Sequence, residues 1–143
     1  MVAQRNIGSE ILAKFGAAKY YVATGSGLAA VTGEVIDTQG YRSCTVAVTW
    51  NTTLASGKTF KLAVEYQQGS TTACNDTATA LQASTEMAAY GGTLTGCTSF
   101  DLDLSDKKRY VRVNFTPALD AANTDICVTA VTVILGGAVT KPC

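Results

Sequence analysis

The chain has 143 residues and is 47% hydrophobic but only 15% charged, against roughly 25% charged residues in typical soluble domains. Eleven Lys and Arg residues balance eleven Asp and Glu residues, so no net field draws the protein to nucleic acid or to an anionic membrane. The sequence contains no histidine, which excludes Ser-His-Asp and Cys-His catalysis and removes the commonest nitrogen ligand of metal sites. The length fits one domain, and its low charge suits a surface that meets a partner.

The first 27 residues differ in pattern from the rest of the chain. Four apolar side chains have the spacing of one or two amphipathic helical turns: Ile7, Ile11, Leu12 and Phe15. We therefore predict an N-terminal arm, residues 1–27, and a β-sandwich domain, residues 28–143. The arm is either a first helix or strand packed on the body or a segment that embraces a neighbouring subunit.

The body has the composition of antiparallel strands, with Val, Thr and Tyr in short runs separated by Gly, Ser and Asn. Strands are predicted at residues 28–36, 42–50, 58–67, 91–104, 109–115 and 123–137. We expect the second and third of these to form a hairpin, because both have one apolar face. The run from Ile126 to Leu135 is apolar on both sides, which predicts a strand in the centre of a sheet or under a partner.

Alternation within the strands predicts the core. The inward side chains are expected to be Cys44, Val46, Val48 and Trp50, then Phe60, Leu62, Val64 and Tyr66, then Val111, Val113 and Phe115. The Ala-rich segment 79–90 is predicted to be a short helix or an irregular insertion. The whole pattern indicates an all-β fold, an antiparallel β-sandwich or jelly roll.

Five cysteines lie far apart in the sequence: Cys44, Cys74, Cys97, Cys127 and Cys143. None forms a C-x-x-C pair, so we expect no zinc site. The odd number favours reduced thiols, with Cys44 and Cys127 buried in strands. A disulfide between Cys74 and Cys97, which both lie in turn-like sequence, is the alternative.

Two polar clusters of the sequence are candidates for chemistry. Asp101 and Asp103 share one face of a predicted strand, but we expect them to form a solvated strand edge rather than a catalytic pair or, with Asp106, a calcium site. The basic run Lys107 to Arg109 is predicted to be a turn with local ion pairs. The sequence therefore predicts no catalytic residue, no metal and no cofactor, and hence a protein that is not an enzyme.

Four segments resemble, in order and spacing, a family of small tailed-phage capsid decoration (cement) proteins: Val35–Tyr41, Phe60–Ser70, Lys107–Val113 and Val131–Gly136. The resemblance covers residues 28–137. It implies a β-sandwich or jelly roll on the outer surface of the virion, which bridges major capsid protein subunits as a dimer or trimer. The sequence departs from the family in its N-terminal arm, in the Ala- and Thr-rich segment 71–95 and in its five cysteines.

The partner contacts are predicted to come from the arm and from one edge of the sandwich. Tyr and Arg are enriched at interface centres, so the candidate contact residues are Arg5, Lys14, Tyr20, Tyr21, Tyr110 and Arg112. With no secretory signal or membrane-spanning run recognised, we expect synthesis in the host cytoplasm. Two other functions fit the composition. One is a tail or head-completion component, and the other is a carbohydrate- or host-surface-binding module, for which Trp50, Tyr66 and Tyr110 could form an aromatic platform, although Trp50 and Tyr66 are expected in the core.

Overall fold

A computed structural model describes residues 11–23, 28–89, 91–120 and 124–138. These residues form strands and connections, with no helix among them. The strands are β1 (Leu12–Val22), β2 (Ile36–Asp37), β3 (Ser43–Leu54), β4 (Thr59–Gly69), β5 (Thr79–Ala89), β6 (Gly92–Asp103), β7 (Tyr110–Leu119) and β8 (Ile126–Gly136). No helix that is long and apolar enough to span a membrane occurs in this part of the chain.

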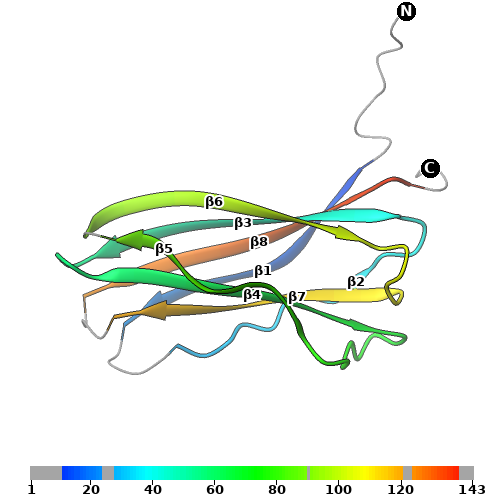
Figure 1. The fold of residues 1–143 in the computed structure, drawn as a ribbon, viewed down its shortest axis with the longest axis horizontal. Helices are drawn as coiled ribbons and strands as arrows, with labels where there is room; N and C mark the ends of the chain where they lie inside the picture. The colour runs from blue at the N-terminus through cyan, green and yellow to red at the C-terminus, as the bar shows by residue number, and fades with distance from the viewer. Residues whose placement is uncertain (1–10, 24–27, 90, 121–123, 139–143) are drawn as a thin grey trace, which may run out of the picture.

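The strands form two four-stranded antiparallel sheets packed face to face (Figure 1). Sheet A has the order β1-β8-β3-β6, and sheet B has the order β2-β7-β4-β5. Each strand of the first half pairs with its counterpart counted from the end: β1 with β8, β2 with β7, β3 with β6 and β4 with β5. The chain therefore follows the path of one long hairpin that folds over on itself. The β3–β8 and β4–β7 pairings join its parts into the two sheets. This is the jelly roll that the sequence predicted.

The predicted hairpin between residues 42–50 and 58–67 is wrong. These segments form β3 and β4, which lie in opposite sheets. β3 pairs with β8 and β6, whereas β4 pairs with β7 and β5. Their apolar faces match because both face the same core from its two sides, not because they are neighbours in one sheet.

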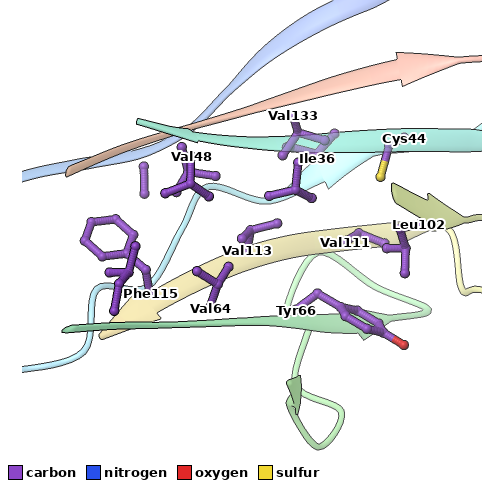
Figure 2. Packing of buried hydrophobic residues seen from close by; sticks show 14 of the residues in the cluster. Ile36, Cys44, Val48, Val64, Tyr66, Leu102, Val111, Val113, Phe115 and Val133 are labelled. Carbon is purple, nitrogen blue, oxygen red and sulfur yellow. The ribbon is translucent and has the colours of Figure 1, made fainter. Parts of the chain in front are cut away.

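The core lies between the sheets, as Figure 2 shows for part of it. All the side chains predicted to point inward contribute to the core. Val46 and Val48 from sheet A are fully buried, as are Val64, Val113 and Phe115 from sheet B. The strand β8 is central in sheet A, with its alternate residues from Cys127 to Leu135 buried, as its two-sided apolar pattern predicted. Full burial of each such side chain stabilises the fold by about 1.5–3 kcal/mol.

Residues 12–22 of the predicted arm form β1, an edge strand of sheet A that pairs along its length with β8. This is the alternative of a strand packed on the body. The spacing of Ile11, Leu12 and Phe15 resembles that of a helix, but these residues form no helix. A β-bulge between Phe15 and Ala17 breaks the two-residue alternation by which the strand could have been recognised. Ile7 lies outside the described residues.

The segment predicted as a first strand, residues 28–36, is mostly a connection that closes one side of the sandwich. Before β2 begins at Ile36, the segment pairs with β7 through one isolated bridge between Val31 and Phe115, and the amide of Glu34 donates to the carbonyl of Gly16 at 2.7 Å. A Cβ atom at Gly33 would lie 2.0 Å from the carbonyl oxygen of Val113. The segment therefore runs too close to β7 at residue 33 for any side chain, and only glycine fits there.

The segment 79–90, predicted as a helix or an irregular insertion, contains the edge strand β5. Its pairing with β4 shifts register between Phe60 and Lys61 and on both sides of Val64. These irregularities erase the two-residue pattern by which a strand is recognised. The backbone pairing with β4 overrides the helical preference of its alanines.

Candidate functional site: the outer face of sheet A

Cross-strand partners in an antiparallel sheet point to the same side, so the register defines the outer face of sheet A. On β8, Val128, Ala130 and Thr132 alternate with buried residues and therefore point outward. We call the surface around them the neutral face, which comprises Phe15, Ala18, Tyr20, Val22, Ala47, Thr49, Asn51, Thr53, Thr93, Thr95, Cys97, Ser99, Ile126, Val128, Ala130 and Thr132. None of these residues is charged.

Large apolar side chains of the neutral face are open to solvent. Phe15 is 62% exposed, Tyr20 is 56% exposed and Val128 is 42% exposed. A shallow depression over β3 and β8 is lined by Thr49, Trp50, Asn51, Val128 and Ala130. Charge enters the outer face of sheet A only at one end of β6, at Asp101 and Asp103.

The outer face of sheet B has the opposite character, because its polar groups bond to one another. The Arg112 guanidinium donates to Gln67 Oε1 at 2.9 Å, and Asn114 Nδ2 donates to the same oxygen at 2.9 Å. Asn114 Oδ1 accepts the amide of Gly33 at 3.1 Å. At the edge of this sheet, Arg109 pairs with both carboxylate oxygens of Asp37, and this hydrogen bonding lowers the pKa of Asp37.

The residues predicted as partner contacts do not gather on one surface. Lys14 and Tyr20 are exposed on β1, whereas Tyr110 and Arg112 are half-buried on β7 in the other sheet. Tyr21 points to the core side, where burial raises its pKa, and its hydroxyl donates to the Ala29 carbonyl at 2.9 Å. Arg5 lies outside the described residues.

The sequence prediction missed Phe15, Val22 and Val128 as exposed apolar residues. The signal for Val128 was present in the two-sided apolar pattern of residues 126–135, for which a position under a partner was one of the two interpretations. Phe15 and Val22 carried no such signal, because their strand was not recognised.

The acidic residues considered for chemistry are each engaged at the solvent edge. Asp101 Oδ1 accepts the hydroxyl of Thr45 at 2.7 Å, and Asp103 accepts the amide of Ser105 at 2.9 Å, which lowers the pKa of Asp103. Asp106 pairs with Lys107. Across the residues that the structure describes, no group of three His, Cys, Asp or Glu residues could hold a metal ion.

The basic turn forms the ion pairs that the sequence predicted, with partners drawn from a wider area. Lys107 pairs with Asp106 as expected, while Lys108 pairs with Asp76 at 2.6 Å and Arg109 with Asp37. These contacts tie the β6–β7 turn to the loop after β4 and to β2.

The alternative disulfide between Cys74 and Cys97 is wrong: both thiols are free, with Cys74 in the loop between β4 and β5 of sheet B and Cys97 in β6 of sheet A. The buried Cys74 thiol donates to the carbonyl oxygens of Gln67 at 3.3 Å and Tyr110 at 3.5 Å, and Cys97 is exposed in the middle of β6. Cys44 and Cys127 are buried, as predicted, and burial raises the pKa of each thiol to about 11. Cys143 lies outside the described residues.

Of the three aromatic residues proposed for a sugar platform, Trp50 and Tyr66 belong to the core, and Tyr110 is half-buried on β7. Tyr66 is buried, and Trp50 packs against Phe60 with a ring-centroid separation of 6.5 Å and lies over Gly96. The interpretation of Trp50 and Tyr66 as core residues is confirmed.

Comparison with known proteins supports the fold. No protein-family model matches the chain, and no curated protein matches it. Among solved structures, a chain from the Gx strain of infectious bursal disease virus aligns with a TM-score of 0.52 and 7% identity, and the VP2 subviral particle of the same virus aligns with a TM-score of 0.51 and 5% identity. Each alignment covers 90% of this chain but only 32% of the viral chain. The protein therefore has a fold like that of a viral capsid protein and spans about a third of the chains it resembles.

Proposed function

We propose that this protein is a structural component of a virion that decorates and cements a tailed-phage capsid by bridging major capsid protein subunits. The observation that carries the proposal is the neutral face, a sheet surface with exposed aromatic and aliphatic side chains and no charge. The jelly roll shared with a viral particle protein supports a virion role, and the resemblance of residues 28–137 to cement proteins supports the finer assignment.

The chemistry of the neutral face suits adhesion. Dehydrating Phe15, Tyr20 and Val128 is favourable, at about 25 cal/mol per Å² of apolar surface buried. The threonine hydroxyls around them can bond across an interface without the cost of desolvating a charge. The centres of protein interfaces are depleted in charged residues and enriched in aromatic residues, and the neutral face has both properties.

Cementing then follows from geometry and copy number. A domain that covers the junction between two capsid subunits must be stripped from one of them before the two separate. Many copies acting on one shell make a modest affinity at each site sufficient. We assign the protein no catalytic role, and place it on the outer capsid surface after synthesis in the host cytoplasm.

The direct test adds purified protein to capsids assembled from the major capsid protein of the same virus and lacking this chain. We expect saturable binding of hundreds of copies per particle and a higher temperature of capsid opening. Binding of a few copies at one vertex or at the tail would favour a head-completion or tail component, and an absence of binding would refute the proposal.

A further inference from the structure

A jelly roll leaves four sheet edges, and three of them carry features that discourage pairing with another chain. The β2 edge is two residues long, and the pairing of β5 with its neighbour is broken by register shifts. The β1 edge has a β-bulge near Gly16, and the Gly16 carbonyl already accepts the amide of Glu34. Lys14 and Lys19 share the core-facing side of β1 and keep a charge at this edge.

The fourth edge, β6, lacks these protections. Its residues from Gly92 to Asp103 pair with β3 in one unbroken register, without a bulge. The strand contains no Lys, Arg or Pro, and no charge before Asp101. In the described part of the chain, no other element forms backbone hydrogen bonds with the free side of β6. A long, regular and uncharged edge is a template for a further strand.

We propose that β6 pairs with the β6 strand of a second copy of this chain in antiparallel orientation, around a twofold axis at Cys97. The charges of β6 favour the antiparallel orientation. The acidic end of β6 would oppose the threonine end of the other copy, so that Asp101 lies opposite Thr93. A parallel pairing would instead place Asp101 and Asp103 opposite their own copies, and like charges directly opposite destabilise a sheet.

Side-chain packing places the axis. Partners across a continuous sheet share a face, so Thr95 lies opposite Ser99 of the second copy, and the half-buried Leu94 lies opposite Phe100. Moving the axis by one residue to Thr98 would bring Phe100 opposite Gly96. That glycine has no room for it, because the Trp50 ring lies 2.3 Å from where a Gly96 Cβ would be.

The dimer would join two copies of sheet A into one continuous sheet and would double the neutral face. The proposal does not rest on the capsid role, because it concerns the isolated protein in solution. A monomeric protein that still binds capsids would overturn the dimer alone, and a dimer that binds no capsid would overturn only the proposed function.

Sedimentation equilibrium of the wild-type protein and two exposed double variants tests the pairing. Thr95→Lys with Ser99→Lys places lysines opposite one another at the proposed axis, so we expect the dimer dissociation constant to rise at least about tenfold. Thr95→Lys with Ser99→Glu places each lysine opposite a glutamate, so we expect the dimer to persist. Circular dichroism and thermal unfolding verify that both variants fold. A monomeric wild-type protein, or equal dissociation constants for the two variants, would overturn the proposal.

Cys97 gives a second measurement, because directly opposed residues in an antiparallel pair have Cα atoms about 4.5–5.5 Å apart, within disulfide range. In a Cys143→Ser background, added diamide is expected to link two Cys97 sulfurs. The two thiols lose two protons, and their two electrons reduce the diamide. The Cys97→Ser variant should give no linked dimer. Failure of the Cys143→Ser protein to cross-link at concentrations where it is dimeric would contradict an axis at Cys97.

Discussion

The outer faces of the two sheets differ in how their side chains are satisfied. On sheet B, charged and amide side chains bond to one another, as in the group formed by Gln67, Arg112 and Asn114. On sheet A, the neutral face presents threonines and exposed apolar residues, with charge only at the end of β6. A surface whose polar groups are satisfied internally gains little from a partner, whereas exposed apolar surface gains by being covered. The difference is the reason for assigning partner binding to sheet A in the proposed function.

The largest expected effect comes from charging the neutral face. Val128→Asp places a carboxylate on the central strand beside Tyr20, where docking would bury it unpaired. We expect capsid affinity to fall by at least about 30-fold, the scale of an interface hot spot. The measurement is a binding isotherm on capsids that lack the protein.

The matched control for this variant is Lys61→Asp, which places a carboxylate on the exposed side of sheet B. It should leave capsid affinity within about twofold, as expected for a residue outside the interface. Equal losses for the two variants would contradict the assignment of binding to sheet A.

A smaller effect, on stability, is expected from breaking the network on sheet B. Asn114 is 6% exposed and accepts the amide of Gly33. Asn114→Ala leaves that amide without its partner, so we expect a loss of about 1–3 kcal/mol in the free energy of unfolding. Urea denaturation measures the loss. The control Thr132→Ala, on the exposed neutral face, should stay within about 0.5 kcal/mol of wild type.

The buried side of sheet A gives a prediction of opposite sign. Thr129 on β8 is fully buried, and its hydroxyl oxygen has no hydrogen-bond partner among the described residues. Thr129→Val keeps the shape and removes the unsatisfied group, so we expect a stability between that of wild type and about 1 kcal/mol above it. A loss of more than 1 kcal/mol in urea denaturation would show that the hydroxyl is bonded.

The smallest effect concerns pH. Hydrogen bonding from Arg109 holds the pKa of Asp37 below its ordinary value. The resulting stabilisation is therefore present above the unfolded pKa, near 3.9, and is lost as pH falls through the lower folded pKa. The stability difference between wild type and Asp37→Asn should be small, because the pair is exposed. It should be constant from about pH 7 to 5 and should shrink below about pH 4 in urea titrations.

Strand composition and alternation were sufficient to predict the fold class and the core, because burial of Val46, Val48 and Phe115 depends on a local two-residue pattern. They did not predict which strands pair. In a jelly roll, partners such as β1 and β8 lie far apart in the sequence, so neighbouring strands such as β3 and β4 were wrongly joined. The strands β1 and β5 were not recognised for a different reason: β-bulges interrupt the two-residue alternation of apolar and polar residues.

The candidate site was only partly predictable. Tyr20 was selected as an interface residue by its type, and the structure places it on the neutral face, but Tyr110 and Arg112 were selected by the same criterion and lie on sheet B. Residue type alone does not distinguish an exposed side chain from one bonded within its own sheet. That distinction depends on the register between distant strands.

The most direct test is a cryo-electron-microscopy reconstruction of the virion that carries this chain, at a resolution that orients the jelly roll. The account predicts many copies on the outer shell at subunit junctions, with Phe15, Tyr20 and Val128 covered by the major capsid protein and the outer face of sheet B turned to solvent. Copies bound through sheet B, or found only at the tail or at one vertex, would contradict it.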